Sequence, residues 1–282
     1  MIKLKDVTYV YMEGGPFEKV AVKDINLHLN SGEFIGLMGH TGSGKSTLIQ
    51  LMAGLIKPES GTVEIDGEVL HSKACNMREM RFKIGLVMQY PEYQLFEETV
   101  FKDIAFGPSN MGLSKDEIER RVKNAAELVG VSEDLFEKSP FELSGGQKRR
   151  VAIAGILAME PKLLILDEPT AGLDPKGREE ILSRISELHK RLGITVVFVS
   201  HSMENIASMA DTIVVMNQGN VVMQGTPDEI FKRADRLCEI GLSVPQITEV
   251  CDRLREKGFP LSEGIYTIEK AKAELEKILK NS

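Results

Sequence analysis

Residues 39–46 have the sequence Gly39-His40-Thr41-Gly42-Ser43-Gly44-Lys45-Ser46, which matches the pattern G-x-x-x-x-G-K-[ST]. A short apolar run, Phe34-Ile35-Gly36-Leu37-Met38, precedes the match, and apolar residues at helical spacing follow it from Leu48 onward. Strand, glycine-rich loop and helix in that order form the context in which this pattern binds phosphate. A glycine-rich turn that binds nothing is the alternative, and the flanking elements disfavour it.

The residue types of this loop suit a nucleoside triphosphate. Its glycines let the backbone wrap closely round phosphates, and the amides at the helix N-terminus point towards them. Lys45 is expected near the β and γ phosphates, and Ser46 is expected to bind Mg²⁺. The residues predicted to contact ATP here are Gly39, Thr41, Gly42, Ser43, Gly44, Lys45, Ser46 and Thr47.

Two carboxylates end a second apolar run. Leu163-Leu164-Ile165-Leu166 has no polar residue, as expected of a strand buried on both faces, and Asp167 and Glu168 follow it. At the carboxyl edge of a parallel sheet, Asp167 can hold Mg²⁺ through water, and Glu168 can orient or deprotonate an attacking water. Paired acids can also cap a helix, but a phosphate loop on a neighbouring strand favours the catalytic interpretation.

The wider pattern predicts an α/β protein. Short apolar runs such as residues 195–199 alternate with helical patterns, which indicates a mostly parallel core sheet. Residues 2–11, 25–29 and 62–69 alternate between apolar and polar instead, which indicates an antiparallel β subdomain. From about residue 90 to residue 158 the strand signal disappears, so we expect an inserted helical subdomain.

Capping residues place the ends of two helices. Ser114, with Glu117 three residues later, forms a capping box that opens a helix closing near Gly130. Asp174-Pro175 suits the first two positions of a further helix, which is expected to run to Leu192 and stop at the glycine that follows.

A domain boundary is expected after a predicted hairpin. Residues 214–224 predict two strands that turn at Gly219-Asn220. Thr226 then opens another capping box, which starts a charged, helix-rich segment. We therefore expect a main domain of residues 1–225 and a small C-terminal helical domain of residues 226–282.

Composition excludes several classes of protein. The formal charge of −7 argues against nucleic acid as a partner, because nucleic-acid binders usually carry a basic face. Three cysteines without metal-ligand spacing predict free thiols. The longest apolar stretch, residues 151–159, is far shorter than the roughly 20 residues that cross a bilayer. The N-terminus lacks the apolar core of a signal peptide, so any membrane role is expected to be peripheral.

A third motif stands between the two phosphate motifs. Residues 143–147, Leu143-Ser144-Gly145-Gly146-Gln147, offer a hydroxyl and exposed amides at a helix N-terminus, which suits an anion. This motif, in this order along the chain, resembles the signature of the ABC ATPases. The resemblance implies ATP and Mg²⁺ as ligands, ATP hydrolysis as the activity, and nucleotides clamped between two chains. The residues then expected to contact the ATP of a second chain are Ser144, Gly145, Gly146, Gln147 and Asp174.

Further residues match the ABC pattern one by one. Gln89 matches the glutamine that reaches Mg²⁺ and water, and His201 matches the switch histidine on the γ-phosphate. Tyr11 fits the aromatic residue that stacks on adenine, although Tyr9 lies on the same face of the strand. The predicted catalytic residues are Glu168, Gln89 and His201, and the predicted metal ligands are Ser46, Gln89 and Asp167.

Within the ABC ATPases, the chain most resembles those of energy-coupling factor (ECF) importers, which take up vitamins or cobalt and nickel ions. Residues 14–19 and 39–41 resemble one of the two ATPase types that pair in these complexes, so a heterodimer with a second ABC ATPase is favoured over a homodimer. Residues 90–100 resemble the family's Q-helix, and residues 241–275 resemble its C-terminal dimerisation domain.

The ECF resemblance implies partners in the membrane. A transmembrane coupling subunit and a substrate-binding membrane subunit are expected, with this chain bound at the cytoplasmic face of the cell membrane. Glu92 and Tyr93 are the predicted contacts with the coupling subunit, and Glu92 is expected to pair with an arginine of that partner. The family more often has an acid where Tyr93 stands. A soluble ABC ATPase without a membrane partner, and a subunit of another kind of ABC importer, are the alternatives.

Overall fold

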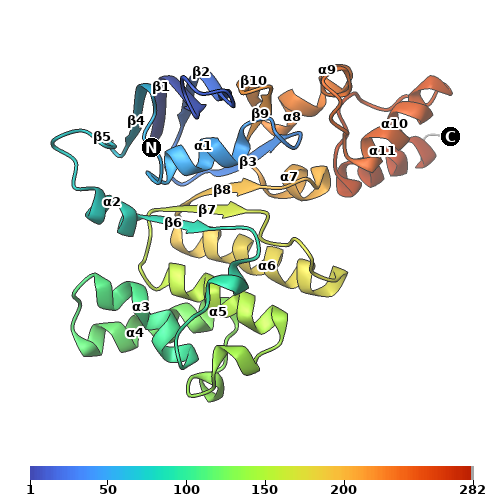
Figure 1. The fold of residues 1–282 in the computed structure, drawn as a ribbon. Helices are drawn as coiled ribbons and strands as arrows, with labels where there is room; N and C mark the ends of the chain where they lie inside the picture. The colour runs from blue at the N-terminus through green and yellow to red at the C-terminus, as the bar shows by residue number, and fades with distance from the viewer. Residues whose placement is uncertain (281–282) are drawn as a thin grey trace.

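The computed structural model describes residues 1–280 and is built around a six-stranded sheet in the order β10-β9-β3-β8-β7-β6 (Figure 1). All neighbouring pairs are parallel except β10 and β9 at one edge. β3 and β8 are buried along their whole length, which confirms the mostly parallel α/β core. The strands are Asn220–Gly225 (β10), Thr212–Asn217 (β9), Phe34–Gly39 (β3), Thr195–Val199 (β8), Leu163–Asp167 (β7) and Ile84–Val87 (β6).

A second, antiparallel sheet has the strand order β2-β1-β4-β5 and confirms the predicted β subdomain. Ile2 pairs with Leu29 on one side and with Ile65 on the other, and all three side chains are buried. Alternate residues of these strands therefore face a core, as the sequence pattern predicts. The strands are Ile2–Tyr11 (β1), Lys19–Leu29 (β2), Ser60–Ile65 (β4) and Glu68–Val69 (β5).

Two helices fix the layers around the parallel sheet. Helix α1, Lys45–Met52, lies between the two sheets, and its apolar residues join a core shared by both (Figure 1). Helix α6, Pro175–Leu192, packs in the core on the other face of the parallel sheet. Its N-cap is Asp174 and its left-handed C-cap is Gly193, as predicted.

The helical subdomain is inserted between β6 and β7, and no strand occurs in this described stretch from residue 90 to residue 158. Ser114 accepts a hydrogen bond from the Glu117 amide, and Gly130 ends the same helix in the left-handed conformation, so both predicted ends are confirmed. The elements are η1 (Pro91–Gln94), α3 (Val100–Asn110), α4 (Lys115–Val129), η2 (Glu133–Leu135), η3 (Pro140–Glu142) and α5 (Gly145–Leu157), with α2 (Met77–Lys83) before β6.

The hairpin of β9 and β10 turns one residue earlier than predicted. Asn217 pairs with Asn220, which leaves Gln218 and Gly219 as the turn instead of Gly219-Asn220. Both turn residues have positive φ, 48° and 79°, as a type I′ turn requires to match the twist of its strands. Glycine therefore takes the second turn position, and the asparagine belongs to the strand.

The segment after β10 packs in two places. The capping box of Thr226 and Glu229 opens α8 as predicted, and Ile230, Phe231 and Leu237 join the main core. A small separate cluster forms further along the chain, around Cys251 and Ile265. The division at residue 226 stays a prediction. The remaining helices are α7 (Met203–Met209), α8 (Pro227–Phe231), α9 (Ala234–Glu239), α10 (Gln246–Glu256) and α11 (Ile268–Lys280).

Within residues 1–280, no helix combines the length and the apolar character that crossing a membrane demands.

Candidate nucleotide site

A cavity of about 420 Å³ lies where β3, β6, β7 and β8 end. Parallel strands bring their carboxyl ends to one edge of a sheet, so residues far apart in the sequence meet there. The cavity gathers most of the predicted nucleotide-binding residues and all three predicted catalytic ones. Its lining residues are Tyr11, Lys19, Ala21, Thr41, Gly42, Gly44, Lys45, Ser46, Thr47, Gln89, Asp167, Glu168 and His201.

Close backbone approach explains two glycines of the loop between β3 and α1. Gly39 and Gly44 have φ of 153° and 103°, which favour glycine. A Cβ atom on Gly44 would lie 2.6 Å from the Ala21 carbonyl oxygen, and one on Gly39 would lie 2.4 Å from that of Met216. No side chain caps the N-terminus of α1, and its first turn carries no acidic residue. The first amides of α1 are therefore available to an anion.

Lys45 supplies a buried positive charge to this loop. Its Nζ donates hydrogen bonds to the carbonyl oxygens of Gly39, at 2.6 Å, and His40, at 2.9 Å. Burial lowers the pKa of the Lys45 amine, and the charges of Glu168 and Asp167 oppose that effect. The buried Ser43 Oγ, in the same loop, has no hydrogen-bond partner in the described structure. A phosphate would satisfy both groups, so the loop fits a nucleotide.

The two carboxylates lie across the cavity from the loop. Burial raises the pKa of Asp167, the neighbouring Glu168 raises it further, and Lys45 and His201 oppose the change. A divalent cation would relieve the cost of holding two adjacent carboxylates in a partly buried site. Carboxylate, hydroxyl and amide oxygens of Asp167, Ser46 and Gln89 line the same cavity and are the donors that Mg²⁺ prefers. The residues therefore fit the predicted metal.

Glu168 and His201 are in direct contact. His201 Nε2 lies 2.8 Å from Glu168 Oε1, within the distance of an ion pair when the imidazole is protonated. Glu168 has a φ of 48°, an uncommon conformation for a residue other than glycine, which marks this position as constrained by its surroundings. The backbone conformation of Glu168 and its contact with His201 therefore constrain the predicted base at the edge of the cavity.

Tyr11 lies at the rim of the cavity. Its hydroxyl is 3.3 Å from Thr47 Oγ1, and its ring contacts Tyr9 edge-to-face with the ring centroids 4.9 Å apart. Only Tyr11 of the two lines the cavity, whereas Tyr9 packs against the core between the sheets. This favours Tyr11 as the adenine-stacking residue, which stays a prediction.

The signature residues are not brought to this cavity. Ser144 is the N-cap of α5, where it accepts from the Gln147 amide while the Gln147 side chain accepts from the Ser144 amide. A Cβ atom on Gly145 would meet nothing within 4 Å, so this helix start is open to a ligand from outside. Asp174 is likewise absent from the lining and caps α6 through a 3.1 Å bond from the Gly177 amide.

Comparison with known proteins agrees with this geometry. The model of the ABC transporter family matches residues 22–171. The chain belongs to the ABC transporter family. It is 57% identical, over 100% of its own length and 98% of the relative, to the energy-coupling factor transporter ATP-binding protein EcfA2 of Caldanaerobacter subterraneus. Over 99% of its length it is also 57% identical to the EcfA2 of Clostridium tetani, covering 98% of that protein. These relatives place it among the ECF transporter ATP-binding proteins.

Solved structures of this ABC family show the same fold. The chain matches cbiO1 of Clostridium perfringens, part of the ABC transporter complex cbiONQ, with a TM-score of 0.75 and 41% identity over 89% of this chain and 98% of that one. It matches the ATP-binding cassette MJ0796, a dimer in a post-hydrolysis state with ADP and Pi, with a TM-score of 0.71 and 32% identity over 80% and 98% of the two chains. These findings confirm the predicted ABC ATPase of the ECF type.

Glu92, predicted to pair with an arginine of the membrane partner, instead pairs with an arginine of this chain. Glu92 is not free for an arginine of a membrane partner, because its carboxylate oxygens accept from Arg149 Nε, at 2.9 Å, and Arg149 Nη2, at 2.7 Å. Arg149 is only 2% exposed, so this pair is buried within the chain itself. Tyr93, beside it, is 84% exposed and remains available to a partner.

Sequence reasoning missed four residues of functional interest in this ABC ATPase. Lys19 and Ala21 line the nucleotide cavity from β2, and neither belongs to a motif that predicts contact with a nucleotide. Asp103 lines a cavity beside the Q-helix, and burial raises the pKa of its carboxyl group. Arg149 was one of three consecutive cations after the signature, and only its burial distinguishes it from its neighbours.

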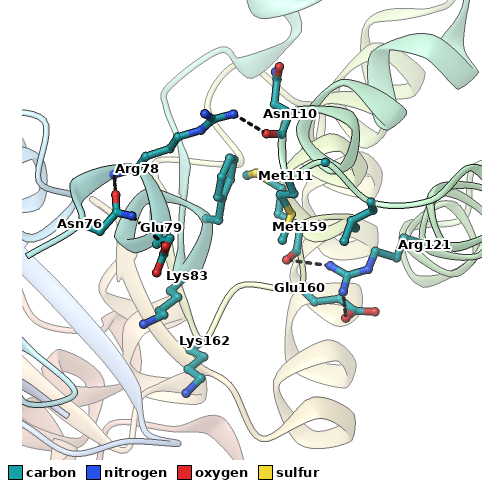
Figure 2. A pocket seen from close by; sticks show the side chains of 13 residues that line it. Asn76, Arg78, Glu79, Lys83, Asn110, Met111, Arg121, Met159, Glu160 and Lys162 are labelled. Atoms are coloured by element: carbon teal, nitrogen blue, oxygen red, sulfur yellow. Dashed lines mark hydrogen bonds and ion pairs between the residues drawn. The ribbon is translucent and has the colours of Figure 1, made fainter.

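Two adjoining cavities lie where α2 meets the helical subdomain of this ABC ATPase. One, of about 380 Å³, is mainly apolar and lies beside η1 and α3. The other, of about 650 Å³, is shown in Figure 2, where Arg78 reaches towards Asn110 and Arg121 towards Met159 and Glu160. Both cavities share the residues Phe82, Asn110 and Met159, so together they form one groove.

Proposed function

We propose that this ECF transporter ATPase hydrolyses Mg-ATP with Glu168 as the base, and does so only when a second ATPase chain supplies the signature contacts. One observation carries the proposal. The cavity gathers Lys45, Asp167, Glu168 and His201, whereas Ser144 lies outside it at an open helix start. A chain with its motifs divided in this way needs another copy of the fold to complete each site.

The residues of the cavity divide the chemistry among themselves. Lys45 and the first amides of α1 bind and orient the β and γ phosphates. Glu168 accepts a proton from the attacking water, and His201 holds that carboxylate in place through the 2.8 Å contact. Ser46, Gln89 and Asp167 would hold Mg²⁺, which neutralises charge on the phosphate oxygens when bound.

We further propose that the second ATPase is a different chain of the same family. The expected heterodimer follows from the resemblance of residues 14–19 and 39–41 to one of two paired ATPase types. The related cassette MJ0796 is described as a dimer with ADP and Pi, which supports a two-chain arrangement around nucleotides. In such a pair, Ser144, Gly145 and Gly146 would close over the triphosphate bound by the other chain, and Asp174 would lie at the contact.

The groove where α2 meets the helical subdomain is the proposed docking site for the transmembrane coupling subunit, at the cytoplasmic face of the membrane. Phe96 and Phe106 are exposed, contact each other edge-to-face and line its apolar cavity, and the exposed Tyr93 directly precedes the lining residue Gln94. Such a patch on a surface marks an interaction site. Asp103 Oδ2 accepts from the amides of Phe96, at 3.1 Å, and Glu97, at 2.9 Å, which leaves Oδ1 for a cation of the partner.

Ser144→Ala tests the two-chain mechanism. In the assembled complex, we expect turnover to fall by at least about tenfold, because the serine hydroxyl would touch phosphate only in the closed dimer. ATP affinity of the isolated chain, measured with a fluorescent ATP analogue, is expected to stay within about twofold because Ser144 is outside the cavity. Full turnover by the variant, or steady hydrolysis by a monomer in light scattering, would refute the proposal.

A further inference from the structure

Arg149 is the largest buried charged side chain of the described protein. It lies in the first half of α5, five residues after the signature serine Ser144, and is only 2% exposed. A buried guanidinium is stable only if its N–H groups donate hydrogen bonds to nearby acceptors. Arg149 donates four such bonds. Its partners come from two other functional segments of the chain, which makes the residue more than a surface ion pair.

The first pair of bonds reaches the segment directly after the predicted base. Arg149 Nη1 donates to the carbonyl oxygens of Pro169, at 3.1 Å, and Ala171, at 2.8 Å. Glu168, the residue before Pro169, has a φ of 48°. A strained residue keeps its conformation only where the surrounding structure determines it. Arg149 fixes the chain immediately after that residue, and the Ala171 amide closes the same turn on the Glu168 carbonyl oxygen at 3.0 Å.

The second pair of bonds reaches the segment after Gln89. Glu92 in η1 accepts both Nε and Nη2 of Arg149, at 2.9 Å and 2.7 Å, in the parallel two-bond geometry that only arginine offers. Tyr90, between Gln89 and η1, has a φ of 55°, and its ring centroid lies 5.9 Å from the Arg149 guanidinium carbon. Arg149 therefore fixes the turn that carries Gln89 towards the cavity.

We infer that Arg149 is a positioning residue. It links helix α5 to the segments that follow Glu168 and Gln89, and it thereby sets the placement of these two residues. The Arg149 side chain thus connects two parts of the proposed mechanism. The start of α5, with Ser144, faces the nucleotide of the other chain, and the segments after Glu168 and Gln89 act on the nucleotide of this chain. A shift of α5 moves the peptide after Glu168 and the carboxylate of Glu92 together. Arg149 does not line the nucleotide cavity, so its effect is on turnover and not on nucleotide binding.

The competing explanation is that Arg149 only stabilises the fold. Substitutions that change its hydrogen bonds without unfolding the chain distinguish the two explanations. Lysine keeps the charge and can pair with Glu92, but one ammonium cannot also hold both carbonyl oxygens in the planar fork of a guanidinium. A buried ion pair can often be replaced by apolar residues without loss of stability. Arg149→Met combined with Glu92→Met removes both charges together, so we expect it to keep the fold while it removes the hydrogen bonds to Pro169 and Ala171.

The test measures ATP hydrolysis by the assembled complex, with thermal unfolding of each variant. For Arg149→Lys we expect the kcat to fall by about 10- to 100-fold, as for other small misplacements of catalytic groups, with the KM for ATP within about twofold. For the double methionine variant we expect the same loss of kcat with a Tm close to that of the wild type. Arg120→Lys is the matched control, since Arg120 also binds a glutamate, Glu117, by two bonds but on the exposed surface. Its turnover is expected to be unchanged.

Each result of this experiment either supports or overturns the positioning role of Arg149. A double variant that folds and turns over like the wild type shows that the arginine only stabilises, which overturns the inference. So does an Arg149→Lys variant whose loss lies in KM alone. If Arg149→Lys does not fold, the double variant carries the test by itself. The readout does not depend on which chain supplies Ser144, so failure of the two-chain proposal would leave this inference standing.

Discussion

His201 Nε2 lies 2.8 Å from Glu168 Oε1, at the point where β7 and β8 deliver their last residues to the nucleotide cavity. The contact joins the proposed base with the one histidine, among the residues that the structure describes, that lines this cavity. The histidine side chain is half exposed, whereas the glutamate side chain is mostly covered. In the proposed mechanism, the more exposed histidine is the one of the two that would sense the γ-phosphate, and its contact would pass loss of that phosphate to the proposed base.

Replacement of the base tests its role. For Glu168→Gln we expect ATP binding to be retained and hydrolysis to fall by about 10² to 10⁴, the range for loss of a positioned base. The amide keeps the shape and can still meet His201, so we also expect the variant to accumulate as a nucleotide-bound dimer. Single-turnover hydrolysis and size-exclusion chromatography with light scattering measure both effects. Near-normal turnover would remove Glu168 from this role.

The raised pKa of Asp167 predicts that the protein becomes less stable towards unfolding as pH rises. Burial raises the pKa of this carboxyl group above its ordinary 3.8, so the folded state holds the proton more tightly than the unfolded chain does. The free energy of unfolding contributed by this group therefore falls as pH rises above that value, and the cost disappears where both states are protonated.

Asp167→Asn mimics the protonated form and should raise the Tm of the nucleotide-free chain at pH 7.5, by roughly 1 to 4 °C for a domain of this size. The gain should shrink as pH falls towards 4.5, and Mg²⁺-dependent hydrolysis should be lost at every pH. Differential scanning calorimetry across this range measures the effect. A gain that does not vary with pH would show that burial of the charge is not its origin.

The docking groove can be tested without touching the nucleotide site. Tyr93→Glu and Phe106→Glu place a charge on exposed aromatic positions, 84% and 46% accessible, beside the apolar cavity. We expect each to reduce recovery of the membrane subunits in co-purification by about tenfold, which corresponds to roughly 1.4 kcal/mol of binding. The Tm and ATP affinity of the isolated chain should not change.

Leu192→Glu is the control for this groove experiment, since Leu192 is 48% exposed at the end of α6 and belongs to neither cavity of the groove. Its recovery of membrane subunits should equal that of the wild type. If the groove variants recover them as well as this control does, the partner docks elsewhere.

Local chemistry made much of the fold and site predictable. Loop 39–46, the acids after Leu166 and the caps at Ser114, Asp174 and Thr226 each depend on neighbours within a few residues, and each lies as predicted. The pairing of Glu92 with Arg149 joins positions 57 residues apart, and nothing in either local pattern signals it. An exposed acid in the sequence became a buried ion pair because α5 packs against η1 in three dimensions.

The phosphate loop also contacts the C-terminal segment, which leads to a last prediction. His40 Nε2 lies 2.9 Å from the Ile240 carbonyl oxygen, and Glu204 at the start of α7 accepts a 3.3 Å bond from the Gln246 amide. The segment from Ile240 to Gln246 is thus bound at one end by the loop before α1 and at the other end by α7, the helix that follows His201. Residues of the loop line the nucleotide cavity, and α7 begins two residues after His201, which also lines it.

His40→Ala should free this segment. We expect the amides of residues 241–248 to exchange with solvent about tenfold faster, since loss of one of the two side-chain hydrogen bonds favours local opening. His28→Ala, on an exposed position of β2, is the matched control and should leave these amides unchanged. Hydrogen exchange with mass spectrometry provides the measurement. Equal exchange in the two variants would mean that the Glu204 bond and apolar packing hold the segment alone, and that the loop has no mechanical link to the C-terminal helices through His40.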